Sequence, residues 1–139
     1  MNPKLIILDT SFLIQCFIGR NQYLKEIANL VKSNKIILCT CVESILELQN
    51  TIADNDVKKY LVYRQPVIAK FMAWYKYNTE IFEIRNTHIL GRDPNDSMWL
   101  NLIESSQAEY LVTNDKDLLE LQEFQNCRIV RIKDFIGLI

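Results

Sequence analysis

Acidic side chains stand in this sequence at points where strands and helices are predicted to begin or end. Asp9 follows the apolar run LIIL, and Asp115 and Asp117 follow a second apolar run that ends in Val112 and Thr113. Carboxylates that lie together repel one another and raise each other's pKa unless a positive charge lies among them. Hard divalent cations such as Mg²⁺ and Mn²⁺ prefer oxygen ligands, so a cluster of these acids would favour such an ion.

Two further acids could join this cluster. Glu47 lies in the stretch VESILELQNTI, flanked by Leu46 and Leu48, so it falls near the edge of an apolar helix stripe. Asp96 lies in the stretch DPND, at the third position of a predicted helix that leads into the strand before Asp115. The four acids lie far apart in the sequence, on separate predicted elements, so only the tertiary structure could bring them together.

Each acid also has a purely structural interpretation. Asp9 fits the N-cap of a helix, as do Asp93 and one of the two acids Asp115 and Asp117. A carboxylate at Asp96 would interact favourably with a helix dipole, and Glu47 fits a solvated helix face. For any single acid, the structural and the functional interpretations both remain open.

Alternating hydrophobic patterns define the elements that would position these acids. Predicted strands cover residues 4–8, 35–41, 79–84, 109–113 and 127–132. Predicted helices cover residues 21–33, 42–53, 56–77 with a break near Pro66, 94–106 and 116–123. Strands that alternate with helices predict an α/β fold: a three-layer α/β/α sandwich with a mainly parallel central sheet of four or five strands. In such sheets, sites form at the carboxyl ends of the strands.

Composition sets limits on the class of protein. The chain has 139 residues, 49% of them apolar, and a formal net charge of −1, which favours a single domain over residues 1–139 and indicates no strongly basic nucleic-acid binder. Its four cysteines form no Cys-x-x-Cys pair and only one histidine accompanies them, so a zinc site is not expected. No apolar run approaches the roughly 20 residues of a membrane span. We expect a reduced, cytoplasmic protein.

Four stretches together resemble the PIN-domain family, in the form of the single-domain ribonucleases known as toxins of toxin–antitoxin pairs. They are LIILDTS, ILELQNTI, RDPNDSMWL and AEYLVTNDKDLLEL, and their order and approximate spacing match over nearly the whole chain. The last two are specific when they occur together, whereas the first is weak by itself. The resemblance implies a PIN-like fold, metal-dependent endoribonuclease activity with Mg²⁺ or Mn²⁺, and single-stranded RNA as substrate.

The resemblance also implies roles for individual residues. Asp9, Glu47, Asp96 and Asp115 would be the catalytic acids, and the metal would be held by Asp9, Asp96, Asp115 and Asp117. Thr113 would support the site from its edge. Hydrolysis would follow because a divalent ion lowers the pKa of a bound water and neutralises charge on the phosphate.

Charge and aromatic content suggest where partners would bind. Arg92 and Lys116 flank the acids and could contact substrate phosphates, although both also fit ordinary solvated side chains. Residues 57–79 carry five basic side chains, no acid and several aromatics, which could guide RNA. The helical spacing of Tyr60, Tyr63 and later aromatics instead favours core packing and a homodimer interface. A toxin would also have a cognate antitoxin. The alternative function is a non-catalytic PIN-fold interaction module with a degenerate acidic site.

Overall fold

Six strands form one sheet in the part of the chain that the structure describes, in the order β3-β2-β1-β4-β6-β5. The computed structural model describes residues 2–19, 21–84 and 94–139. The strands are β1 (Lys4–Leu8), β2 (Ile36–Thr40), β3 (Thr79–Ile81), β4 (Tyr110–Val112), β5 (Glu123–Phe124) and β6 (Cys127–Val130). The helices are α1 (Thr10–Gly19), α2 (Gln22–Lys32), α3 (Val42–Ala53), α4 (Asn55–Leu61), the 3₁₀ turn η1 (Val62–Arg64), α5 (Gln65–Asn78), α6 (Pro94–Ser106), α7 (Lys116–Leu121) and α8 (Ile132–Leu138).

The sheet is parallel except at one edge. β1 pairs with β2 on one side and β4 on the other, β2 pairs with β3, and β4 pairs with β6, all in parallel. Only β5, which forms a hairpin with β6, runs antiparallel. The predicted α/β class and mainly parallel sheet are confirmed. The described residues add one two-residue strand to the four or five expected.

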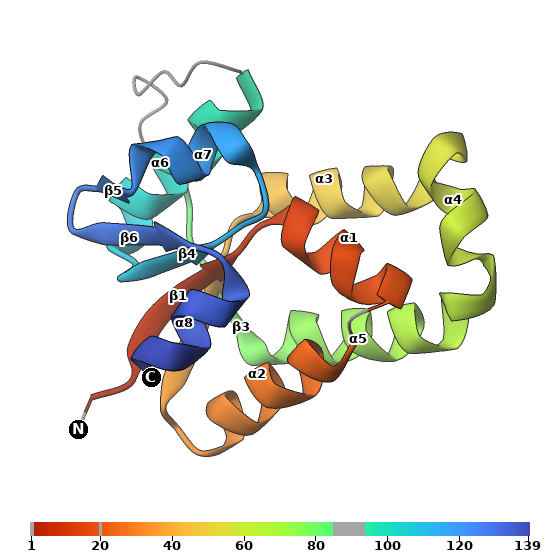
Figure 1. Cartoon of the computed structure of the whole chain (residues 1–139), viewed down its shortest axis with the longest axis horizontal. Helices are drawn as coiled ribbons and strands as arrows, with labels where there is room; N and C mark the ends of the chain where they lie inside the picture. Colours follow the sequence, from red (N-terminus) through yellow and green to blue (C-terminus); the bar gives the residue numbers. More distant parts are fainter. Residues whose placement is uncertain (1, 20, 85–93) are drawn as a thin grey trace.

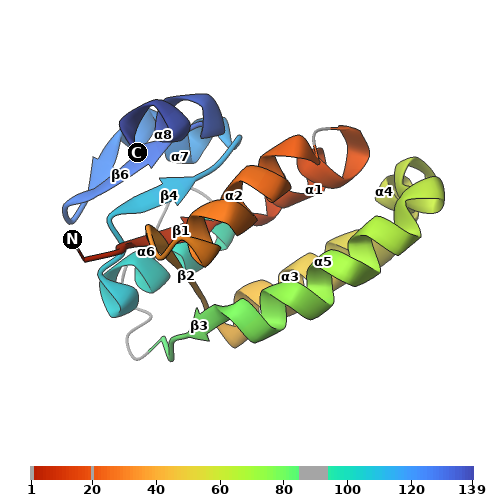
Figure 2. The same cartoon turned by 90° about the horizontal axis from the view of Figure 1, so that it is seen from below.

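Helices cover both faces of the sheet (Figures 1 and 2). On one face, Ile6 and Leu8 of β1 pack in a cluster with residues of α1, α2, α5 and α8. On the other face, Ile7 packs with residues of α6 and α7, including Trp99 and Leu118. Alternate residues of β1 therefore enter different cores, as expected for a central strand buried on both faces.

Hydrophobic periodicity does not predict α1. Its sequence, TSFLIQCFIG, is apolar on nearly every side, and Phe12, Leu13, Ile14 and Phe17 are all buried. A helix that is hydrophobic all round belongs to the interior and shows no amphipathic pattern. α1 lies directly after β1, so this unpredicted helix begins at the candidate site.

The helical stretch expected over residues 56–77 consists of two helices joined by η1, and Pro66 lies in the first turn of α5, so the predicted break near Pro66 is confirmed. Tyr60, Tyr63 and Phe71, expected to lie on one stripe that serves core packing and an interface, do not share one face. Tyr60 is 60% exposed and Tyr63 is 93% exposed, whereas Phe71 is buried. The 3₁₀ turn changes the helical phase between α4 and α5, so residues on its two sides no longer lie on one face. Figures 1 and 2 show α4 at the end of the molecule away from β5 and β6.

Other differences concern the ends of elements. β3 stops at Ile81 rather than residue 84, and β6 stops at Val130 rather than residue 132, because Ile132 begins α8 and is buried. β5 was not predicted. Its turn to β6 uses Gln125 and Asn126 at φ of 47° and 67°, as in a type I′ turn, but it lacks the glycine that usually signals one.

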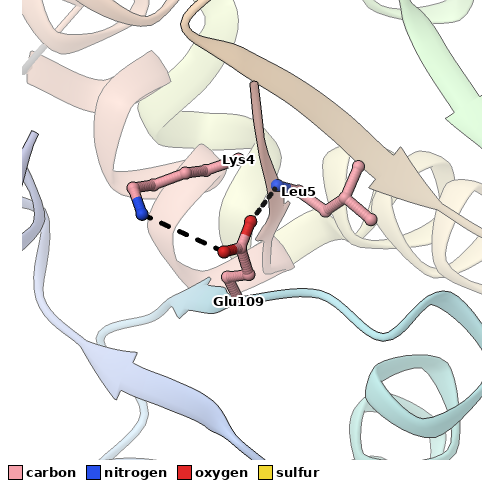
Figure 3. A network of polar contacts seen from close by, with 3 residues as sticks. All are labelled: Lys4, Leu5 and Glu109. Carbon is pink, nitrogen blue, oxygen red and sulfur yellow. Dashed lines mark hydrogen bonds and ion pairs between the residues drawn. The ribbon is translucent and has the colours of Figure 1, made fainter. Parts of the chain in front are cut away.

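At the amino edge of the sheet, Glu109 ties β1 to the segment before β4 (Figure 3). Its Oε2 accepts a hydrogen bond from the backbone N–H of Leu5 at 3.1 Å, and Lys4 Nζ lies 3.9 Å from Oε1. The ion pair is exposed and contributes little, so the backbone bond is the more important link. No helix within the described residues has the length and apolar character to cross a membrane.

Candidate functional site

Asp9 is buried at the carboxyl end of β1, where it caps the start of α1. The residue is 2% exposed, and its Oδ1 accepts a hydrogen bond from the backbone N–H of Phe12 at 2.9 Å. The hydroxyl of Ser11 donates to the same carboxylate and lies 2.8 Å from Oδ1 and 3.0 Å from Oδ2. The helix-cap interpretation is therefore correct for Asp9. A surface cap, however, needs no such burial.

Thr113 connects Asp9 to the end of β4. The residue is fully buried, and its hydroxyl donates to Asp9 Oδ2 while accepting a hydrogen bond from the backbone N–H of Asp115 at 2.9 Å. The backbone N–H of Asn114 donates to Ser11 Oγ at 3.2 Å. Two hydroxyl groups thus join the ends of β1 and β4, and they hold the Asp9 carboxylate in one orientation.

Burial makes the charged form of Asp9 costly. The pKa of Asp9 is raised from 3.8 to about 6, mainly by desolvation and to a smaller extent by the negative charge of Asp115. Hydrogen bonds from Thr113, Phe12 and Ser11 act in the opposite direction, but they do not offset the burial. A cation beside this carboxylate would lower its pKa again.

Asp115 is the N-cap of α7, and Asp117 lies in the first turn of the same helix. The side chain of Asp115 accepts a hydrogen bond from the backbone N–H of Asp117 at 2.9 Å. Lys116, predicted to contact substrate, is exposed between them. Asp115 is half-buried, and its negative charge is a minor cause of the raised pKa of Asp9.

Glu47 lies in the middle of α3, half-buried, beside the start of α1. Burial raises the pKa of Glu47, and the hydroxyl of Thr10 acts to lower it. That hydroxyl makes no hydrogen bond of normal geometry within the described residues. Because Thr10 directly follows Asp9, Glu47 lies close to the first turn of α1.

Asp96 is buried, at 3% exposure, in the first turn of α6 on the opposite face of the sheet from α1. The predicted helix over residues 94–106 is confirmed at both ends. Arg92, predicted to bind substrate, and Asp93, predicted to cap this helix, lie outside the described residues.

The predicted residues are thus brought together only in part. Hydrogen bonds link Asp9, Thr113 and Asp115, and Glu47 approaches through Thr10. Across residues 2–19, 21–84 and 94–139, no three His, Cys, Asp or Glu side chains form a group that could hold a metal ion. The ligand set of Asp9, Asp96, Asp115 and Asp117 therefore stays a prediction.

The donors that do come together fit a hard cation. Asp9 and Asp115 supply carboxylate oxygens of like charge, and burial raises the pKa of the Asp9 carboxyl. Mg²⁺ is usually held by one or two carboxylates together with waters, so a closed cage of protein ligands is not required. All four cysteines are buried free thiols, so they make no disulfide.

Sequence reasoning did not select Ser11 or Thr10. The signal was present, because both follow Asp9 directly in the stretch LIILDTS. Hydroxyl residues next to a cap commonly bond to nearby backbone and side-chain groups. Without α1 in the prediction, there was no helix start to which these two residues could be assigned.

Comparison with known families gives one result. A sequence model described as the PIN domain matches residues 5–117, which is 113 of the 139 residues and includes all of the predicted acids. A search of curated proteins finds no match to the chain.

Proposed function

Because the chain belongs to the PIN-domain family, whose members are generally nucleases, we propose that it is a metal-dependent endoribonuclease that hydrolyses RNA phosphodiester bonds. One observation carries this proposal most directly. The buried carboxylate of Asp9 stands at the carboxyl end of the central strand, and Asp115 acts on it from the end of the neighbouring strand. Ligand sites of α/β sheets form at this edge.

The proposed roles follow from the chemistry of the side chains. Asp9 and Asp115 would hold Mg²⁺ or Mn²⁺, with Asp96 and Asp117 completing the set and Glu47 acting as the fourth catalytic acid. When bound, such an ion would activate water and neutralise charge on the phosphate. Thr113 and Ser11 orient the Asp9 carboxylate through their hydroxyl groups. Lys116, exposed between two acids, and Arg92 would bind substrate phosphates.

The test is cleavage of single-stranded RNA by the wild-type chain, Asp9→Asn and Asp115→Asn, each with Mg²⁺, Mn²⁺ or EDTA. Cleavage should require the metal and fall by at least 100-fold in both variants, since each removes a ligand charge. Asp54→Asn is the matched control for Asp115→Asn. Asp54 caps α4, and its side chain accepts a hydrogen bond from the N–H two residues later at 2.9 Å, as that of Asp115 does. Cleavage that survives EDTA and both substitutions would refute the proposal.

A specific observation also supports the second candidate, a non-catalytic PIN-fold interaction module. Both oxygens of Asp9 already accept hydrogen bonds within the fold, and Asp115 already caps a helix. These acids therefore contribute to the stability of the fold even without a bound ion. RNA binding with no cleavage in either metal, unchanged in Asp9→Asn, would favour this module.

We further propose that the protein is the toxin of a toxin–antitoxin pair, acts in the cytoplasm, forms a homodimer and is blocked by an antitoxin. The resemblance of its motifs supports the toxin role. The buried, free cysteines support a reducing compartment. Exposed Tyr60, Tyr63 and Tyr77 support an interface on α4, η1 and α5. Induced expression should arrest growth for the wild type and not for Asp9→Asn, and light scattering after gel filtration should give twice the chain mass of 16.4 kDa. Normal growth on expression of the wild type would count against the toxin role. A monomeric mass would count against the homodimer.

A further inference from the structure

A polar pocket of about 290 Å³ lies next to the acidic site, on the side of α1 and α8. Four polar side chains line it: Gln15 of α1, Tyr23 of α2, Asn114 after β4 and Arg131 after β6. Its floor is apolar, formed by the buried Phe12, Cys16 and Ile132. The volume is at the lower end of the range for small-molecule sites, so it suits about one nucleotide.

Two residues connect this pocket physically to the acidic site. The backbone N–H of Phe12 donates to Asp9 Oδ1, while the Phe12 side chain forms part of the pocket floor. Asn114 lies between Thr113 and Asp115, and its backbone N–H donates to Ser11 Oγ. The pocket therefore adjoins the two segments that carry Asp9 and Asp115, although neither carboxylate lines it.

The sheet register places Arg131 on the same edge. The backbone N–H of Asp9 donates to Val112 O at 3.1 Å, and that of Thr113 donates to Val130 O at 3.0 Å. Asp9, Thr113 and Arg131 thus follow the last paired residues of three adjacent strands. Neighbouring strands lie roughly 5 Å apart, so the backbones of Asp9 and Arg131 are roughly 10 Å apart.

The polar groups of the pocket are chemically suited to a nucleotide. Among the described residues, no ion pair or hydrogen bond engages the guanidinium of Arg131, which can bind a phosphate with two parallel hydrogen bonds. The amides of Gln15 and Asn114 carry both donors and acceptors, as the edges of nucleobases require. Tyr23 is half-buried and offers a ring on which a base can stack.

We infer that this pocket, called here the α1–α8 pocket, binds one nucleotide of single-stranded RNA next to the scissile phosphate and sets the sequence preference of cleavage. Arg131 binds the phosphate, and Gln15 and Asn114 hydrogen-bond to the edge of the base. Sequence-specific recognition of RNA commonly reads unpaired bases by such contacts. The inference rests on the nuclease function proposed above, and it adds a specificity site to it.

Binding is tested without cleavage, on the whole chain in EDTA. Each of the four ribonucleoside 5′-monophosphates, and inorganic phosphate alone, is titrated to millimolar concentration while the ¹⁵N amide resonances are recorded. Shifts should concentrate at Gln15, Asn114 and Arg131, and the four nucleotides should differ in affinity. A second polar pocket, lined by Gln107, Glu109 and Asn126 at the other edge of the sheet, is the internal control and should not respond.

Variants assign the roles. Arg131→Ala should weaken nucleotide binding about 10- to 100-fold, the usual effect of losing charged hydrogen bonds. Arg128→Ala, an exposed arginine on β6 outside the pocket, should leave binding unchanged. Gln15→Ala should alter the preference among the four bases, and in cleavage assays Arg131→Ala should raise KM more than it lowers kcat.

The outcomes separate the two proposals. Equal binding by wild type and Arg131→Ala, or equal shifts with inorganic phosphate and with all four nucleotides, overturns the nucleotide site while leaving the nuclease proposal intact. Base-dependent binding in the pocket with no metal-dependent cleavage supports the site and refutes the nuclease. No shift in the pocket at millimolar nucleotide also overturns the inference.

Discussion

Replacing Asp9 by asparagine should make the metal-free protein more stable at neutral pH. The carboxylate is almost fully buried, and its pKa is raised from 3.8 to about 6. Between these two values the folded state holds a proton that the unfolded state has lost, so stability falls as pH rises through this window. At 1.36 kcal/mol per pKa unit, the penalty above pH 6 is about 3 kcal/mol. Asparagine carries no charge and caps helices about as well as aspartate.

The assay is urea denaturation of both chains in EDTA, at pH 7.5 and at pH 4.5. At pH 7.5, Asp9→Asn should be more stable than wild type by up to about 3 kcal/mol, less any loss in its hydrogen bonds with Ser11 and Thr113. The difference should shrink by about 2 kcal/mol at pH 4.5, where wild-type Asp9 is mostly protonated. The change between the two pH values isolates Asp9, because other titrating groups are common to both chains.

Magnesium provides the complementary arm. An ion that binds only the folded wild type at 100 times its Kd adds about 2.7 kcal/mol, so saturating Mg²⁺ should remove most of the advantage of Asp9→Asn. A stability difference that is constant across pH would refute the reasoning, since it would mean that Asp9 ionises at its ordinary pKa. Equal stabilisation of both chains by Mg²⁺ would mean that Asp9 is not a ligand.

Four other substitutions have defined outcomes by the same denaturation assay. Thr113→Val should destabilise by about 1–3 kcal/mol, since it leaves the N–H of Asp115 without a partner and removes one of the two donors to Asp9 Oδ2. It should also move the pH window of Asp9 upward, and an unshifted window would contradict this. Asp54→Ala should lower the free energy of unfolding by about 1 kcal/mol, because it removes a helix cap. Asp115→Ala should lower it by less than this above pH 6, because the substitution also relieves repulsion with Asp9. Equal losses of stability at all pH values would exclude that repulsion. Glu47→Gln should stabilise the metal-free chain at pH 7.5, since burial raises the pKa of Glu47. An unchanged free energy of unfolding would mean that this carboxylate is fully solvated.

The strand ends that carry the candidate site could be predicted from sequence because apolar runs stop abruptly there. LIIL ends at Asp9 and the run before Asp115 ends at Thr113, and the structure pairs these ends through backbone and side-chain hydrogen bonds. Parallel pairing of buried strands follows from their alternation with helices. The sequence alone therefore predicts that Asp9, Thr113 and Asp115 lie near one another.

Two features could not be predicted, because one depends on burial and the other on where a strand ends. α1 is buried on most sides, so it lacks the two-faced pattern by which helices are recognised. Arg131 was placed inside a strand predicted over residues 127–132, whereas the strand ends at Val130 and Arg131 precedes α8. That two-residue difference moves Arg131 from an interior position to the edge where Asp9 and Thr113 also lie.

The two outermost strands, β3 and β5, have only three and two residues in the described part of the chain. An edge this short offers few unpaired backbone groups to a neighbouring molecule, and natural proteins use such edges to prevent sheets from joining. Chains of this protein would therefore not associate by extending one sheet into the next. Self-association has to use helix side chains, so its strength should respond to substitutions at the exposed tyrosines and hardly at all to changes along the sheet margins.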